Sequence, residues 1–206
     1  LDLAALLCSR VCHDIISPVG AIINGLEVID EDNGEEMREF AFDLIRRSAN
    51  QASAKLQFAR LAFGAAGSTG AEIDLGDAEK VATGYMAGEK AEFSWQAPRV
   101  LMAKNRVKLV LNLILLATAA VPRGGSVSVV IEGEADRPRF TIRSAGPTAR
   151  IPAAFEKLVP GDIAGIAIDA QAVKAYYAGA LPRECGMSIT AVLDDADVVI
   201  TASSID

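Results

Sequence analysis

Apolar side chains near the N-terminus recur at intervals of four and three over almost thirty positions. At about 100° per residue these positions fall within roughly 120° of arc, which indicates one long amphipathic helix over residues 2–29 with a stripe about 40 Å long. The stripe consists of Leu7, Val11, Ile15, Val19, Ile22, Leu26 and Ile29. Such a stripe needs another element to cover it.

A second long helix is predicted after the turn signal EDNG at residues 31–34. It begins at Glu35 and ends near Phe63, with acidic residues in its first turn and basic residues later, as the helix dipole favours. The short turn makes the two helices an antiparallel hairpin, and a lone hairpin cannot bury the apolar faces of both. Pairing with a second copy in a four-helix bundle would bury them, so the pattern predicts a homodimer.

Helical and strand patterns alternate in the rest of the chain. Helices are predicted over residues 73–87, 104–121 and 169–180, and strands over 91–96, 126–134, 137–145, 187–193 and 197–203. Helices interleaved with mostly antiparallel strands form an α/β sandwich. We therefore predict an α+β chain with two domains, a helical hairpin at residues 1–66 and the sandwich at residues 71–206.

The charge balance argues against two classes of partner. The 206 residues carry a formal net charge of −7 without a Lys/Arg cluster, so neither nucleic acid nor a membrane surface is expected to bind. No stretch of 18 residues is apolar and free of charge, so no membrane span is predicted. Three cysteines do not suit a secreted disulfide framework, and Cys8 and Cys12 are interpreted as buried small hydrophobes. These features favour the cytoplasm.

His13 is the only histidine of the chain. It lies about 160° from the centre of the apolar stripe, so its imidazole is predicted to point out of the bundle. One interpretation is a solvent-facing side chain without a role. A metal site lacks further ligands, and serine hydrolysis lacks a G-x-S-x-G sequence. The remaining interpretation is a nucleophile, because a neutral imidazole can attack phosphorus with one ring nitrogen while the other is hydrogen-bonded.

Two neighbours bear on this interpretation. Pro18 lacks an N–H and clashes with the carbonyl of Asp14, so a bend is expected just after His13. Asp14 lies about 100° around the helix from His13. Its carboxylate could orient the imidazole or accept a proton, or it could be an ordinary solvated side chain.

The stretch His13-Asp14-Ile15-Ile16-Ser17-Pro18 resembles the H-box of sensor histidine kinases, H-[DE]-x-x-[NTS]-P, and it lies in the first helix of a hairpin, where that box belongs. Residues 105–131 resemble the N-box helix and the following strand of the kinase ATP-binding domain, with Asn112-Leu113 as its N-L pair. The resemblance implies a Bergerat-type, histidine-kinase-like sandwich for the second domain.

The resemblance is incomplete where a nucleotide would bind. Leu116 stands where the family has a second asparagine that helps hold Mg²⁺, and Ser144 stands where it has the aspartate that reads adenine. Gly146 remains but the next glycine is Thr148, and residues 165–168 look like a remnant of the second glycine box. Metal binding, adenine recognition and the glycine-dependent lid are therefore expected to be lost or weakened, leaving a degenerate ATPase-like domain.

A kinase-like hairpin joined to such a domain resembles the ChpT-type histidine phosphotransferases of alphaproteobacterial cell-cycle phosphorelays, whose signature is very similar to CSRVCHDIISPVGAIINGLE. The resemblance implies a cytoplasmic homodimer without ATP use. Its His13 would take a phosphoryl group from the receiver domain of a hybrid kinase, CckA in the family, and pass it to the response regulators CtrA and CpdR. It also implies no cofactor for this chain, because the receiver brings Mg²⁺.

By the same resemblance, Asp14 is the second catalytic candidate, and receivers are expected to dock on a strip made of Arg10, Ser17, Gly20, Ala21 and Asn24. Two other functions stay open. An ATP-dependent histidine kinase would bind ATP. A non-catalytic dimeric adaptor would tolerate loss of the imidazole.

Overall fold

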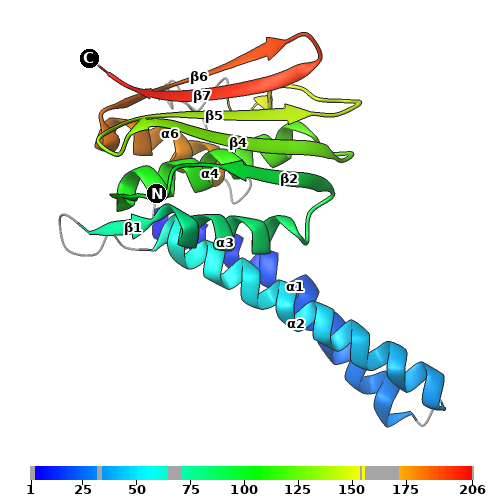
Figure 1. Ribbon diagram of the computed structural model, residues 1–206. Helices are drawn as coiled ribbons and strands as arrows, with labels where there is room; N and C mark the ends of the chain where they lie inside the picture. The colour runs from blue at the N-terminus through cyan, green and yellow to red at the C-terminus, as the bar shows by residue number, and fades with distance from the viewer. Residues whose placement is uncertain (1–2, 32–33, 65–70, 154, 156–171, 206) are drawn as a thin grey trace.

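The computed structural model describes residues 3–31, 34–64, 71–153, 155 and 172–205. Figure 1 shows a long two-helix hairpin that projects from an α/β body, with the C-terminal end of its first helix and the N-terminal end of its second helix far from the body. The hairpin consists of α1 (Leu3–Asp30) and α2 (Glu35–Phe63). Both predicted helices are confirmed, and α1 runs continuously through Pro18.

Small residues bring α1 and α2 close together. Gly25 is buried, and a Cβ added there would lie 2.7 Å from Cγ1 of Ile45 and 3.3 Å from the backbone oxygen of Ala41. Because glycine permits this approach, α1 turns the side that carries Gly25 and the buried Pro18 toward α2. The predicted apolar stripe of α1 is therefore divided between a side that faces α2 and a side that faces solvent. On the solvent side, Val19 and Leu26 remain 42% and 50% exposed.

The expectation that Cys8 and Cys12 are buried is wrong for the single protomer, where both are exposed. They lie on the side of α1 that is turned away from α2, in line with the exposed part of the apolar stripe.

In the described part of the chain, the body is built on a five-stranded sheet with strand order β2-β4-β5-β7-β6. The strands are β2 (Ala91–Gln96), β4 (Gly125–Glu134), β5 (Arg137–Ala145), β6 (Met187–Asp194) and β7 (Asp197–Ser204). β2 pairs parallel with β4, and the other neighbours pair antiparallel. Alternate residues such as Val127, Val129 and Ile131 are buried, because helices cover one face of the sheet.

The helices of the body are α3 (Leu75–Met86), α4 (Lys104–Ala120) and α6 (Val173–Cys185). Residues 107–117 of α4 are all buried, which explains why this helix has no polar face. Asp74 is the N-cap of α3, and its Oδ1 accepts a hydrogen bond from the Gly76 amide at 2.6 Å. The predicted α+β class, a helical hairpin followed by an α/β sandwich, is confirmed.

Three elements differ from the prediction. β1 (Glu72–Asp74) and β3 (Leu101–Ala103) form a short antiparallel ribbon that was not predicted, because strands of this length leave no periodic pattern. α6 continues through Pro182 to Cys185, beyond the predicted end at residue 180. The predicted start of that helix, at residue 169, lies outside the described residues.

The hydrophobic core extends from the body into the end of α2. Phe58 and Ala62 are 1% and 0% exposed and belong to the same buried cluster as the apolar residues of α4. The ring centroids of Phe58 and Tyr85 lie 4.3 Å apart, with the rings tilted by 32°. The division into residues 1–66 and 71–206 stays a prediction, but side-chain packing is continuous across it.

α1 has the length and hydropathy of a membrane-spanning helix. In the fold it is one half of a hairpin, packed on a helix with many charged residues, and it carries the ion pair between Arg10 and Asp14. A helix that must cover a hairpin partner also needs an apolar side, so this composition is explained without a bilayer. The prediction that the chain has no membrane span is retained on this ground.

Candidate functional site

His13 projects from α1 into solvent, with 76% of its side chain exposed. Two neighbouring positions on the helix add little bulk. Ser17 is small and exposed, and a Cβ added at Gly20 would meet nothing within 4 Å. The structure therefore places the imidazole where the helical pattern predicted it. A protein surface could approach the ring without a steric barrier.

The remaining residues of the predicted docking strip differ in exposure. Asn24 is exposed and Ala21 is half-buried. Arg10 is 21% exposed and is already paired, since its Nη2 lies 2.7 Å from Oδ1 of Asp14 and its Nε donates to Oδ2 at 3.2 Å. The strip beside His13 thus brings together four of the five predicted residues, with Arg10 at its edge as a partner of Asp14.

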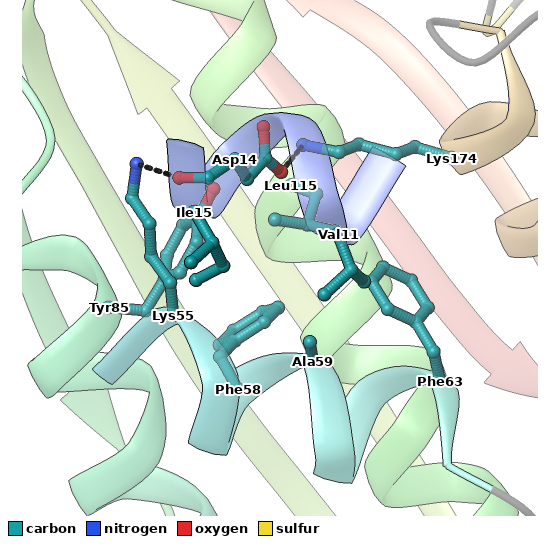
Figure 2. Close-up of a pocket in the computed structure, with 10 residues that line it drawn as sticks. All are labelled: Val11, Asp14, Ile15, Lys55, Phe58, Ala59, Phe63, Tyr85, Leu115 and Lys174. Atoms are coloured by element: carbon teal, nitrogen blue, oxygen red, sulfur yellow. Dashed lines mark hydrogen bonds and ion pairs between the residues drawn. The ribbon is translucent and has the colours of Figure 1, made fainter. Parts of the chain in front are cut away.

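Asp14 contacts cations from three helices. Besides Arg10 of α1, its Oδ2 lies 3.4 Å from Nζ of Lys174 on α6, and its backbone oxygen accepts a hydrogen bond from Nζ of Lys55 on α2 at 3.4 Å (Figure 2). Nδ1 of His13 lies 3.6 Å from Oδ1, too far for a good hydrogen bond but close enough to attract a protonated ring. Asp14 is therefore a fixed carboxylate, and the solvated alternative is wrong.

The contact with Lys55 has a local cause. Position 18 is a proline, so the carbonyl of Asp14 lacks the amide donor that a regular helix provides four residues later. Lys55 of α2 supplies a replacement donor to this carbonyl. The proline thereby ties the helical turn after His13 to the neighbouring helix.

An apolar floor lies beneath the cations that hold Asp14. Figure 2 shows Phe58 and Phe63 of α2 and Leu115 of α4 below the turn, around a cavity of about 10 Å³, close to the smallest volume that holds one water. Burial lowers the pKa of the Lys174 ammonium, which is 17% exposed, while the charge of Asp14 acts in the opposite direction. Burial also raises the pKa of Tyr85, which lines the same cavity.

Sequence reasoning missed Lys55, Lys174 and Tyr85. Each is a single polar residue within a helix, a pattern typical of a solvated side chain, and helix packing brings them together from distant parts of the chain. One signal was available, because Pro18 implies a carbonyl at Asp14 that needs a donor from elsewhere.

The positions that bind nucleotide in the kinase pattern are used for packing. Leu116 is 4% exposed and offers no oxygen to a metal. Ser144 is fully buried and its Oγ donates to the carbonyl of Ala117 at 2.9 Å. The residues present therefore do not fit Mg²⁺-ATP in the way the kinase pattern requires. Within the described residues, no group of three or more His, Cys, Asp or Glu could hold a metal ion.

Two retained residues of the pattern also have structural roles. Asn112 is fully buried, and its Nδ2 donates to the carbonyl oxygens of Lys108 at 2.8 Å and Ala62 at 3.1 Å, which ties the end of α2 to α4. A Cβ added at Gly146 would lie 2.6 Å from the backbone oxygen of Gly124, so close packing requires glycine there. Residues 165–168, the predicted remnant of the second glycine box, lie outside the described residues.

Comparison with known proteins shows which family has this arrangement. Residues 75–197 match the family model of the histidine phosphotransferase C-terminal domain. The chain is 52% identical to the protein phosphotransferase ChpT of Brucella abortus over 98% of this chain and 95% of that protein. It also resembles a solved bacterial phosphotransferase, with 50% identity, a TM-score of 0.87 and coverage of 98% and 96% of the two chains.

A more distant structure bears on the fold alone. The Acinetobacter baumannii histidine kinase AdeS superposes over 93% of this chain and 96% of its own, with a TM-score of 0.50 and 10% identity. The kinase-like character predicted for the sandwich is thereby confirmed at the level of fold. The chain belongs to the ChpT-type histidine phosphotransferase family and acts as a protein phosphotransferase.

Proposed function

We propose that this chain relays a phosphoryl group through His13 in a cytoplasmic phosphorelay. The donor is the receiver domain of a CckA-like hybrid histidine kinase, and the acceptors are CtrA-like and CpdR-like response regulators. The observation that carries the proposal is the single, 76% exposed imidazole beside Asp14, whose carboxylate pairs with Arg10 of α1 and Lys174 of α6 and whose backbone oxygen accepts from Lys55 of α2. A site of this kind suits a reaction with a group carried by another protein.

Transfer takes place in two displacements at phosphorus. Nε2 of His13 attacks the aspartyl phosphate of the donor, the N–P bond forms, and the P–O bond breaks as the carboxylate leaves with the electron pair. The ring becomes a cation, and Oδ1 of Asp14 stabilises it from the Nδ1 side. A carboxylate of the second receiver then attacks the phosphorus, the N–P bond breaks, and neutral imidazole is released.

The receivers dock on the strip formed by Ser17, Gly20, Ala21 and Asn24, with Arg10 at its edge. Its small residues leave room for a helix of the partner beside His13. The chain uses neither ATP nor a cofactor of its own in this proposal, because Leu116 and Ser144 are committed to packing. The receiver supplies the Mg²⁺ that neutralises charge on the transferred group.

One labelling experiment tests the relay and its main rival. The chain is mixed with a radiolabelled, phosphorylated receiver domain, and we expect acid-labile, base-stable label on residue 13 that is lost when a second receiver is added with Mg²⁺. In a parallel reaction, ATP and Mg²⁺ replace the phosphorylated receiver, and the chain is expected to stay unlabelled. Label acquired from ATP alone would instead identify an active kinase.

We further propose that the functional unit is a homodimer, joined as a four-helix bundle through the exposed apolar side of the hairpin. On α1 this side includes Ile16, Val19, Ile23 and Leu26, whose exposed fractions are 70%, 42%, 50% and 50%. At about 100° per residue they share one face whose centre lies roughly 100° from His13. A second copy would bury this face, together with Cys8 and Cys12, and leave the imidazole accessible.

Replacing Ile23 and Leu26 together by Asp should convert the dimer to a monomer. Two charges in an apolar interface cost several kcal/mol, so the dimer dissociation constant should rise at least about 100-fold. Sedimentation velocity measures this. Asn24→Asp adds a charge between them on the opposite side of α1 and should leave the dimer intact. A wild-type chain that sediments as a monomer at tens of micromolar would contradict the proposed assembly.

A further inference from the structure

Lys174 connects the second domain to the carboxylate beside His13. It is the second residue of α6, and its Nζ reaches across to Oδ2 of Asp14 on α1 at 3.4 Å (Figure 2). The proposed phosphotransfer mechanism gives no role to this lysine. The link is notable because the hairpin carries the reacting group, whereas α6 belongs to the sandwich.

The stability of the fold does not explain this lysine. A cation in the first turn of a helix is unfavourable with the helix dipole, and the Lys174 side chain is 17% exposed. Burial is the main influence on its pKa and lowers it, which means that the fold disfavours the charged ammonium. A methionine of similar length would fill the same space beside Phe63 and Leu115 without burying a charge, and Asp14 would keep Arg10 as its partner.

The contacts of Asp14 indicate what the lysine does. Oδ2 interacts with Lys174 and with Nε of Arg10, while Oδ1 faces both Nη2 of Arg10 and Nδ1 of His13. Arg10 lies on the same helix as Asp14, so a rotation of the Asp14 carboxylate can be followed by the Arg10 side chain without breaking their ion pair. Lys174 is anchored in a different element, and it therefore fixes which oxygen points to the imidazole.

We propose that Lys174 is a positioning residue for phosphotransfer, holding Asp14 so that Oδ1 stays directed at Nδ1 of His13. The 3.6 Å between Nδ1 and Oδ1 has to shorten for a hydrogen bond to form. Once Oδ1 accepts from Nδ1, the proton stays on Nδ1 and Nε2 presents its lone pair to the incoming phosphorus. This role rests on the proposed function of His13. Lys174 touches neither the phosphoryl group nor the ring, and it acts through Asp14 alone.

The test combines transfer kinetics with a direct view of the imidazole in the full-length chain. Lys174→Met should slow phosphoryl transfer from a phosphorylated receiver about 10-fold to 100-fold, without changing the receiver concentration that gives half-maximal rate. Lys174→Arg retains the cation and should keep most of the rate. Lys80→Met, which removes an exposed lysine paired with Asp77 on α3, is the matched control and should transfer at the wild-type rate.

Because His13 is the only histidine, nitrogen NMR of the imidazole reads this site without interference from another ring. In the neutral ring of Lys174→Met, we expect the proton to shift from Nδ1 toward Nε2 relative to wild type and Lys80→Met. The midpoint of thermal unfolding should change little, because Asp14 keeps Arg10 as its partner. A purely structural lysine would give the reverse, a lower unfolding midpoint with an unchanged tautomer ratio.

The two proposals can fail separately. If wild-type His13 is labelled and Lys174→Met transfers within about two-fold of wild type with an unchanged tautomer ratio, the role of Lys174 is overturned and the relay stands. If wild-type His13 takes no label from any receiver, the relay and the catalytic purpose of Lys174 both fall. The tautomer ratio would then still show whether the lysine orients Asp14.

Discussion

Replacing His13 by glutamine is expected to abolish phosphoryl transfer between receivers, with a loss of at least about 1,000-fold. Glutamine has a similar length and polarity but no ring nitrogen with a nucleophilic lone pair, and no other histidine can replace it. The measurement is the rate at which label leaves a phosphorylated receiver and appears on a second receiver. No label should accumulate on the variant itself.

The variant should otherwise behave as the wild-type chain. The imidazole is 76% exposed, so the free energy of unfolding is expected to change by less than about 0.5 kcal/mol. Binding of receivers should persist, because the docking strip is untouched. Transfer that survives the substitution would favour the alternative of a non-catalytic adaptor that brings two receivers together.

The largest expected effect on stability comes from Phe58→Ala, at about 3–5 kcal/mol of unfolding free energy. Phe58 is 1% exposed, lies on Tyr85 of α3 and also lines the cavity beneath Asp14. Its removal leaves a cavity where the hairpin and the sandwich share one core. Denaturant unfolding followed by circular dichroism should show a single transition that moves to lower denaturant concentration.

Phe40→Ala is the matched control on the same helix. Phe40 is 57% exposed, so its loss should cost no more than about 1 kcal/mol. If unfolding instead shows two transitions and Phe58→Ala moves only one, the hairpin and the sandwich fold independently and the shared core does not couple them.

Much of this protein can be predicted from local patterns in its sequence. The spacing of apolar residues depends on the period of the element that carries them, so α1, α2, α4 and the strands β4 to β7 could be located from the sequence. The same reasoning placed His13 on the outer side of α1, because a residue's direction on a helix depends on its position in the repeat. The H-box resemblance then connected this position with phosphotransfer.

Periodicity does not specify which elements meet, or at what angle. The apolar stripe of α1 was predicted as one face, but close approach at Gly25 turned one side of it to α2 and left Val19 and Leu26 exposed. Likewise, periodicity does not distinguish Phe58 from the other apolar residues of the second helix, and only packing shows that it belongs to the core of the sandwich.

The sequence by itself determined most helices and strands, the hairpin and the outward position of His13, because each depends on residues within a few helical turns of one another. Only the tertiary structure decided the surroundings of this proposed nucleophile. Asp14 is held by Lys55 and Lys174 from two other helices, and such contacts depend on how the helices pack. A lysine that binds a half-buried carboxylate and one that faces water have the same local pattern, so only the assembled fold distinguishes them.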